Sequence, residues 1–451
     1  MTGSTGVSSD LASDPLFPAL KDYLIDHTGL SYYADKNAEL ADRIDRRLEV
    51  AGAGDCTSYL RLLKDGRAGE TELDALVEEL TIGETYFFRQ PELFDALRDV
   101  VFPEIIEKNR ATRRIRIWSA GCATGPEAYS IAILLKRDLG AALAGWDVDI
   151  LGTDINRRFL QRAAAGVYDE WAFRATPDSV RTACFRPQGA HHAIAPDYRR
   201  AVSFQYHNLV KHPFPSILHD LQAFDLILCR NVMIYFNRDL CRKIISQFEG
   251  CLVERGWLAL GPSDLSIDLF QHFSMRNIGG AIVHQKPGDV TIHMPPSPQP
   301  SPAYGGRGGI VDVMPPAPDV EPRAGAQSLA DRGDWDAALR AYERLIDAEP
   351  LNASVHFYYA LVLRQVANYD ASEKTLRHAI YLDRRNALAH HHLGLLLHKR
   401  GDAKGAIRSF QNVLSVLAGL PDDTPIENGD GMTVSDLRGV ARLNMETRAV
   451  L

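Results

Sequence analysis

The 451-residue chain has few cysteines, no long apolar run and no excess of positive charge, and each shortage excludes a class of protein. Its six cysteines are scattered without a Cys-x-x-Cys pair, which argues against a disulfide framework or a zinc site and suits a reducing cytosol. No stretch of 18 apolar residues occurs, so no membrane insertion is expected. The net charge of −8 argues against nucleic acid as the main partner. The first residues lack a basic segment followed by an apolar run, so we expect no signal peptide and a cytoplasmic protein.

Proline is unevenly distributed and divides the chain. Ten of the 24 prolines lie in residues 286–325. Proline lacks an amide donor and favours extended backbone, so this segment is expected to be a semi-rigid, solvated linker. It separates a large front part from a smaller tail.

The tail, residues 326–451, contains a repeat with a period of 34 residues. The columns that repeat are Trp335, Tyr369 and Ala403; Ala338, Ser372 and Ala406; Tyr342, Leu376 and Phe410; and Leu345, Ala379 and Val413. Each unit thus has a small residue, a large residue four positions later and an apolar residue three positions after that. This spacing is the packing pattern of tetratricopeptide repeats. We predict an α-helical solenoid of three such units, closed by an amphipathic capping helix over 434–450. An ordinary helical bundle is the alternative.

The front part changes character near residue 110. Residues 15–110 show apolar side chains at three-to-four spacing, which predicts an N-terminal helical domain. Over 111–285, strand patterns alternate with helical ones, which predicts an α/β domain with a parallel sheet covered on both faces. The last two strand patterns, 273–278 and 280–286, are adjacent, so one antiparallel strand is expected at or near an edge.

A strand, a small-residue turn and a helix follow one another from Ile115 to Leu135. Gly121, Ala123 and Gly125 lie in the turn, where small side chains let the backbone approach a ligand closely. The segment has neither the GxGxxG pattern nor a GK[ST] sequence, so a phosphate-binding loop is not indicated. In a doubly wound sheet, ligands bind beyond the carboxyl ends of the strands, and this turn lies at such an end.

Two acidic residues accompany the turn. Asp154 ends the second strand pattern, where a carboxylate can accept hydrogen bonds from both ribose hydroxyls. Its alternative role is N-cap of the helix that follows. Glu127 opens the first helix, and its alternative role is a charge that favours the helix dipole. Together with the turn, these residues indicate a nucleoside cofactor, for which S-adenosylmethionine is the best candidate.

Five segments resemble the chemotaxis receptor methyltransferases, the CheR family, over about residues 15–285. They are TIGETYFFRQPELFDAL, WSAGCATGPEAYSIA, GTDINRRFLQRAAAGVY, the pair Asn208 and Leu209, and CRNVMIYF. The resemblance implies a helical N-terminal domain and a Rossmann-like methyltransferase domain with a small β-subdomain inserted, here at about 184–204. It also implies methyl transfer from S-adenosylmethionine to glutamate side chains of chemoreceptors, with S-adenosylhomocysteine as the second product. Some members carry tetratricopeptide repeats after a linker, as this chain does.

The resemblance also implies the site residues. The cofactor-binding set is Gly83, Thr85, Arg89, Glu127, Asp154, Asn208, Leu209, Arg230 and Asn231. Asn208 and Leu209 match the pair that borders the adenine in the family, and the Asn208 amide has the donor and the acceptor that an adenine edge needs. Arg89 and Tyr235 are the candidates for orienting the reacting groups, since a guanidinium can hold a carboxylate of the cofactor or of the substrate in a fork. A structural ion pair is the alternative for Arg230, and a core position is favoured for Phe87 and Phe88. No metal is implied.

Three residues depart from the family pattern around the cofactor. Gly83 stands where many members have Asn, so that side-chain contact is absent or replaced. Cys122 and Pro126 occupy the turn where members often have other residues. Methyl transfer needs no enzyme nucleophile, so Cys122 is interpreted as a small packed residue.

The expected partner is the cytoplasmic helical bundle of a chemoreceptor. Lys36, Arg43, Arg46 and Arg47 form a basic cluster that could dock an acidic bundle, with a solvated basic face as the alternative. The tail is a candidate for binding a further protein, because stacked helix pairs present a concave groove. Two other functions remain open: a scaffold that only senses S-adenosylmethionine, and a small-molecule methyltransferase.

Overall fold

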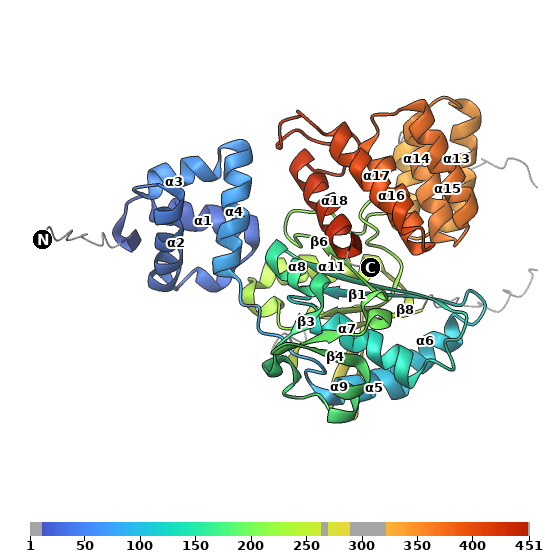
Figure 1. The fold of residues 1–451 in the computed structure, drawn as a ribbon, viewed down its shortest axis with the longest axis horizontal. Helices are drawn as coiled ribbons and strands as arrows, with labels where there is room; N and C mark the ends of the chain where they lie inside the picture. Colours follow the sequence, from blue (N-terminus) through green and yellow to red (C-terminus); the bar gives the residue numbers. More distant parts are fainter. Residues whose placement is uncertain (1–10, 263–268, 289–321, 450–451) are drawn as a thin grey trace, which may run out of the picture.

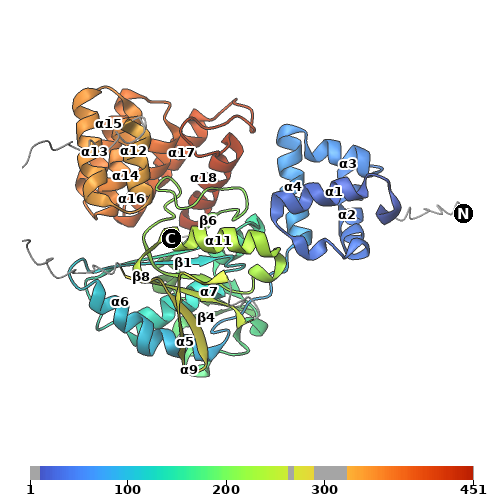
Figure 2. The ribbon, with the colours of Figure 1, turned by 180° about the vertical axis from the view of Figure 1, so that it is seen from behind.

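The computed structural model describes residues 11–262, 269–288 and 322–449. Figures 1 and 2 show three parts: a helical bundle to one side, a central sheet with its helices, and the helical tail above the sheet. Most of the expected linker, residues 289–321, lies outside the described residues, as does the end of the capping-helix prediction. Across the described ranges, no helix combines the length and apolar character needed to span a bilayer.

Four helices form the N-terminal bundle: α1 (Phe17–Thr28), α2 (Asn37–Ala51), α3 (Cys56–Leu63) and α4 (Gly66–Leu80). Leu20, Ile44, Tyr59 and Leu76 from these four helices are fully buried in one cluster. The bundle ends at α4. The next helices, α5 (Pro91–Ala96) and α6 (Phe102–Lys108), were expected in the same domain, yet they pack in the core of the sheet instead.

The central sheet has seven strands in the order β6-β2-β1-β7-β8-β10-β9. Their bounds are β1 Arg114–Ala120, β2 Asp147–Asp154, β6 Val202–Tyr206, β7 Phe224–Cys229, β8 Leu252–Leu260, β9 Ser274–Ile278 and β10 Ala281–Gln285. The first five strands in this order pair in parallel, whereas β10 is antiparallel to both β8 and β9. The predicted antiparallel strand near an edge is therefore confirmed.

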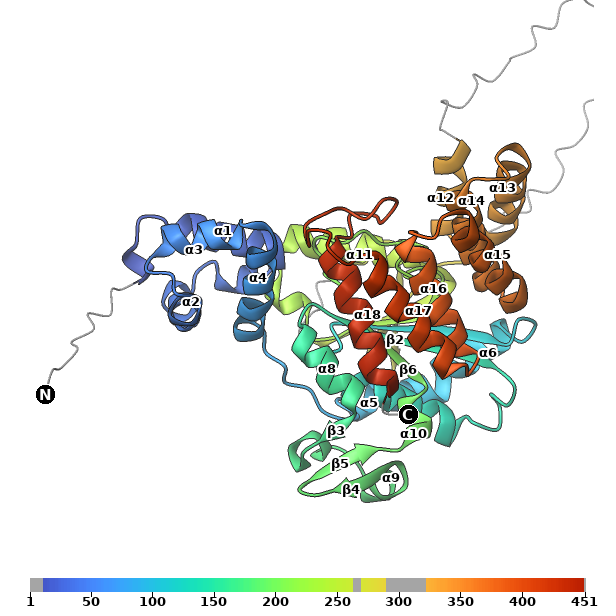
Figure 3. The ribbon, with the colours of Figure 1, turned by 45° about the horizontal axis from the view of Figure 1, so that its top comes forward.

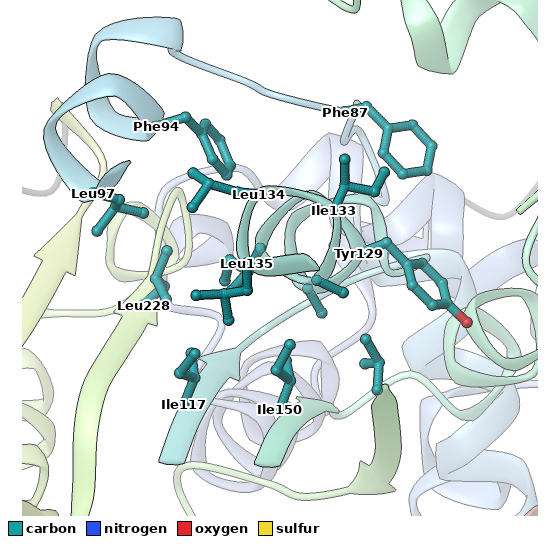
Figure 4. Packing of buried hydrophobic residues seen from close by; sticks show 14 of the residues in the cluster. Phe87, Phe94, Leu97, Ile117, Tyr129, Ile133, Leu134, Leu135, Ile150 and Leu228 are labelled. Carbon is teal, nitrogen blue, oxygen red and sulfur yellow. The ribbon is translucent and has the colours of Figure 1, made fainter. Parts of the chain in front are cut away.

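Helices cover both faces of the sheet. Neighbouring strand residues point to opposite sides, and the strands carry apolar side chains on both faces. On one face, Ile117, Ile150 and Leu228 lie under Tyr129 and Leu134, as Figure 4 shows. On the other face, the Trp118 ring is fully buried in a separate cluster. The helices of this part are α7 (Pro126–Ile133), α8 (Arg157–Ala165), α9 (Asp178–Cys184), α10 (Pro196–Arg199) and α11 (Arg238–Cys251).

A separate antiparallel sheet forms the predicted small subdomain. Its strands are β3 (Val167–Tyr168), β4 (Phe185–Gln188) and β5 (His191–Ile194), in the order β3-β5-β4. The expected range of about 184–204 contains β4 and β5 but begins after β3. Its last residues, 202–204, belong to β6 of the large sheet, where they pair in parallel with β2.

The tail is a stack of helix pairs closed by one further helix, as predicted. The pairs are α12 (Pro322–Asp331) with α13 (Trp335–Ala348), α14 (Ala353–Gln365) with α15 (Tyr369–Leu382), and α16 (Ala387–Lys399) with α17 (Ala403–Val416); the closing helix is α18 (Val434–Ala449). Each 34-residue column falls on the second helix of a pair. Ala338, Leu376 and Phe410 are fully or almost fully buried, which confirms the repeat pattern.

One arginine joins all three parts. Arg157 on α8 donates to Asp74 of α4 at 2.8 Å and to Asp436 of α18 at 3.0 Å. Its guanidinium also lies 3.6 Å from the centre of the Tyr206 ring. Figure 3 shows α18 lying beside α8, and residue contacts between the two helices agree.

Candidate functional site

A cavity of about 350 Å³ lies beyond the carboxyl ends of β1, β2 and β7. Its walls come from the end of α4 and the segment after it, the turn after β1, the start of α8, and the segments that follow β6 and β7. Thr28 and Leu30 of the N-terminal bundle complete it. The predicted site residues that line it are Thr85, Arg89, Glu127, Asp154, Asn208, Leu209, Arg230, Asn231 and Tyr235.

The turn after β1 holds its backbone in conformations that only small residues adopt easily. Gly121 has φ of 72°, and the N–H groups of Gly121 and Cys122 both donate to the Thr153 carbonyl, at 2.8 and 2.9 Å. A Cβ at Gly121 would lie 2.4 Å from Val232 Cγ2, so any larger residue would push the two segments apart. Burial raises the pKa of the Cys122 thiol well above its ordinary value, which fits a packed residue rather than a nucleophile.

Asp154 is a buried carboxylate at the edge of the cavity. Its Oδ2 accepts from the Ala123 N–H at 2.9 Å and its Oδ1 from the Asn156 N–H at 2.8 Å. Burial raises the pKa of Asp154 to about 6, although these backbone donors oppose the shift. The alternative as helix N-cap is wrong, because Asn156 caps α8 by accepting from the Phe159 N–H at 3.0 Å. The Asp154 carboxylate also lines the cavity, where it can accept hydrogen bonds from a ligand.

Glu127 and Arg230 form an ion pair in the cavity wall. Glu127 lies in the first turn of α7, and its two oxygens accept from Ser119 Oγ at 2.7 Å and from Arg230 Nη1 at 3.0 Å. Arg230 Nη2 also donates to the Arg89 carbonyl at 2.6 Å. Both side chains are largely buried, 12% and 3% exposed. Arg230 therefore forms the structural ion pair that was its alternative role, and its side chain also lines the cavity. Ser119 supports Glu127 from inside β1, a role that the strand pattern did not signal.

The segment of Arg89 is held in place from several sides. Arg89 Nη1 donates to the Glu84 carbonyl at 3.1 Å, and the guanidinium lies 5.6 Å from the centre of the Tyr86 ring. Phe87 is fully buried in the main core, as favoured from the sequence. The Phe88 N–H donates to Ser130 Oγ at 2.9 Å. Arg89 can thus reach the cavity from a fixed backbone.

The Asn208 amide is engaged within the protein. Its Nδ2 donates to the carbonyl of His27 in α1 at 2.8 Å, and its Oδ1 accepts from the Val210 N–H at 2.9 Å. This residue was expected to recognise an adenine edge with the same two groups. In the structure it ties the cavity wall to the N-terminal bundle, and the neighbouring Leu209 supplies an apolar surface.

Gly83 is the one predicted residue of the set that lies outside the cavity lining. A Cβ at Gly83 would lie 2.5 Å from Cζ of Phe159. The Phe159 ring, which does line the cavity, occupies the space that a larger side chain at position 83 would need. Phe159 comes from the first turn of α8, and nothing in the sequence marked it as part of the site.

Tyr235 closes the cavity on the side of the bundle. It ends a 3-10 helix, η6 (Met233–Tyr235), and its ring centre lies 5.9 Å from that of Tyr32 in an edge-to-face contact. Apolar side chains stand exposed at the same rim: Ile82 is 48% and Ile234 is 43% exposed.

The basic cluster of the N-terminal bundle is mostly committed to internal contacts. Arg47 binds Glu72 through two hydrogen bonds of 3.0 and 2.7 Å, and Arg43 donates to the Glu79 carbonyl. Arg46 pairs with Asp42 on the same helix. Two of the four predicted basic residues, Arg43 and Arg47, thus tie α2 to α4, while the Lys36 ammonium lies over the Tyr32 ring.

No group of three or more His, Cys, Asp or Glu side chains within the described ranges could hold a metal ion. The chemistry of the cavity walls is instead that of paired charges, amides and apolar groups. A cavity of this size and mixture suits a small organic ligand.

Three family models of known proteins match segments of the chain. Residues 83–279 match the family model of the CheR methyltransferase, SAM binding domain; residues 15–81 match the CheR methyltransferase, all-alpha domain; and residues 323–381 match a tetratricopeptide repeat.

Three curated relatives illustrate the extent of the similarity. The probable biofilm formation methyltransferase WspC of Pseudomonas aeruginosa is 30% identical over 411 residues, 85% of this chain and 94% of that protein. Chemotaxis protein methyltransferase 1 of the same species is 29% identical over 280 residues, 61% of this chain and 98% of that protein. A chemotaxis protein methyltransferase of Borreliella burgdorferi is 31% identical over 239 residues, 52% of this chain and 83% of that protein.

Proposed function

The chain belongs to the CheR family of S-adenosylmethionine-dependent protein methyltransferases, and from this premise we propose that it methylates glutamate side chains in the cytoplasmic helical bundle of a chemoreceptor. The products would be glutamate methyl esters and S-adenosylhomocysteine. The observation that carries the proposal is the gathering of nine candidate residues around one cavity beyond the carboxyl ends of the strands.

The donor groups of the cavity suit S-adenosylmethionine. Asp154 is buried at the edge of the cavity, where its carboxylate suits the ribose hydroxyls. Each Glu127 oxygen also retains a lone pair, which suits the positively charged amino group. Arg89 lies within the same wall, where its guanidinium suits the carboxylate of the cofactor or of the substrate glutamate. Leu209 and Phe159 supply apolar surface for the adenine ring. With Gly83 outside the lining, Phe159 takes its place in the proposed binding set.

The protein's contribution to the reaction is orientation. Bound S-adenosylmethionine supplies a methyl carbon on a positively charged sulfur. A substrate glutamate has an ordinary pKa of about 4.3, so it is ionised at neutral pH and needs no general base. Arg89 and Tyr235 then have to hold its carboxylate in line with the methyl group, and such alignment can supply up to about 7–11 kcal/mol. Opposite charges cancel as the reaction proceeds, so a dry cavity does not oppose it.

The rim of the cavity favours a protein as the substrate. Exposed Ile82 and Ile234 offer apolar contact area beside the reaction centre, which a small polar substrate would not need. One relative that aligns with 85% of this chain is named as a probable biofilm formation methyltransferase. We therefore propose that the methylated receptor belongs to a pathway that controls biofilm formation.

Transfer of a tritiated methyl group tests the proposal. The full chain, methyl-tritiated S-adenosylmethionine and receptor cytoplasmic fragments should yield label that base releases as methanol. Arg89→Ala and Tyr235→Phe should lower this rate by at least tenfold, whereas Arg98→Ala, a 40% exposed arginine paired with Asp95 and Asp99, should not. Binding of S-adenosylhomocysteine without any transfer would support a sensing scaffold instead. Label on small molecules alone would refute the protein substrate.

A further inference from the structure

A short turn of the methyltransferase part is inserted into the tail. Residues Ser216–Leu221 form this turn, which two backbone hydrogen bonds between its end residues close at 3.2 and 2.9 Å. Ile217 and Leu218 at its tip are 0% and 2% exposed, and both belong to the apolar cluster of the tail rather than to that of the sheet. The Ile217 N–H donates to Asp331 of α12 at 2.7 Å. The tail thus holds this turn as part of its own core.

Asp220 anchors the turn electrostatically. Its carboxylate lies 3.2 Å from Arg364 Nη2 and 2.7 Å from Gln365 Nε2, both at the end of α14. On the other side, Arg116 of β1 donates to it at 2.7 Å. The Asp220 side chain is 34% exposed, and its partial desolvation alone would raise its pKa, but the guanidinium groups of Arg116 and Arg364 outweigh this effect and hold the pKa well below its ordinary value. The carboxylate therefore stays charged and depends on the tail for part of its compensation.

Contiguous contacts lead from this anchor to the cavity. His219, next to Asp220, stacks on His212 with ring centres 5.9 Å apart and planes 2° from parallel. His212 Nδ1 accepts from the Asn208 backbone N–H at 3.3 Å. Asn208 and the following Leu209 line the cavity. Each step is a packed or hydrogen-bonded contact, so the turn and the cavity wall belong to one contiguous network of the kind that can carry coupling between sites.

We propose that Arg364 of the tail is a positioning residue for the cofactor cavity, acting through Asp220, His219 and His212 on the loop that carries Asn208. The tail then does more than recruit partners: its docking sets the affinity for S-adenosylmethionine. This inference rests on the proposed role of the cavity as the cofactor site.

The matched control is a second contact between the tail and the sheet. Lys399 of α16 lies 2.7 Å from Asp149 and 3.0 Å from Asp147, at the start of β2. The cavity lies at the opposite end of that strand, about 20 Å away at 3.3 Å per residue. Arg114 links Asp149 to Gln365, but Lys399 itself contacts none of Arg364, Asp220, His219 and His212. Loss of Lys399 therefore loosens the tail and leaves the direct contacts of the turn in place.

The test measures the Kd of S-adenosylhomocysteine by calorimetry on full-length variants. Arg364→Ala should raise it about tenfold and raise KM for S-adenosylmethionine equally, with kcat unchanged at saturation. Arg364→Lys should recover most of the affinity, and Lys399→Ala should leave it near wild type. Hydrogen exchange at residues 207–221 should be faster in Arg364→Ala only.

Three results would overturn the inference: an unchanged Kd in Arg364→Ala, an equal rise in Lys399→Ala, or failure of lysine to restore affinity. If Arg364→Ala does not fold, Asp220→Asn attacks the same contact from the other side and should give the same rise in Kd. If the wild-type chain does not bind S-adenosylhomocysteine, the assignment of the cavity fails instead.

Discussion

The buried carboxylate of Asp154 predicts that cofactor affinity and stability depend on pH in opposite directions. In the unliganded chain the pKa of Asp154 is raised to about 6 by burial. A ribose can donate two hydroxyl hydrogens only to the ionised carboxylate, so protonation competes with binding. At pH 5 about nine-tenths of the unliganded protein carries the proton, and at pH 7 about one-tenth does. The Kd of S-adenosylhomocysteine should therefore be about tenfold higher at pH 5 than at pH 7.

Stability of the unliganded chain should change with the opposite sign. The folded pKa of Asp154 lies above the ordinary value of about 3.9, so proton binding favours the folded state. This contribution is fully present below pH 4 and is lost as the pH rises through about 6. A shift of about two pKa units corresponds to about 3 kcal/mol. Relative to Asp154→Asn, the wild-type free energy of unfolding should fall by about that amount between pH 4 and pH 7.

Calorimetric titration at pH 5 and pH 7, with urea unfolding across the same range, measures both effects. Asp154→Asn should bind weakly at both pH values and lose the pH dependence. Asp99→Asn, an exposed carboxylate that pairs with Arg98, should behave as wild type. An equal wild-type Kd at the two pH values, or the same tenfold change in Asp154→Asn, would refute the reasoning.

Two further predictions concern residues whose roles became visible only in the folded chain. Arg47→Met should lower the free energy of unfolding by about 2 kcal/mol, because Arg47 is 18% exposed and pairs with a buried carboxylate. The control Arg46→Met, at an arginine that is 59% exposed, should change this free energy by less than about 0.5 kcal/mol. Equal urea midpoints for the two variants would contradict this prediction. Gly83→Ala should cost about 2 kcal/mol and weaken S-adenosylhomocysteine binding, because the new Cβ meets the Phe159 ring. Phe159→Leu added to it should recover stability, and an unperturbed Gly83→Ala would disprove the packing argument.

The fold could be predicted well because its signals are local. The strand, turn and helix from Ile115 to Leu135 follow one another without interruption, and the position of Asp154 at a strand end follows from the same pattern. Parallel pairing brings the ends of β1 and β2 together, so these residues had to meet. The 34-residue period likewise arises from contacts between adjacent helices, so the spacing of the residues was sufficient to predict the repeat.

The remaining details depend on contacts between residues far apart in the chain. Gly83 lies against Phe159, and Arg47 binds Glu72, through packing that no local periodicity encodes. The Asn208 amide was assigned to the cofactor because its chemistry suits adenine, yet His27 of another part of the chain uses the same group. A side chain's chemistry limits its possible partners, and only the fold decides which of them it meets.

The bridge that Arg157 makes between α4 and α18 bears on how such enzymes can be recombined. In sequence the tail looks like a cassette that could be exchanged between relatives. In the folded chain, Asp436 of the tail is one of two carboxylates that pair with the partly buried Arg157, and the other, Asp74, comes from the N-terminal bundle. A chimera with a foreign tail would need an acidic residue at the equivalent place on its last helix. Two parts of the polypeptide that are far apart in sequence are therefore linked through a single arginine of the part between them.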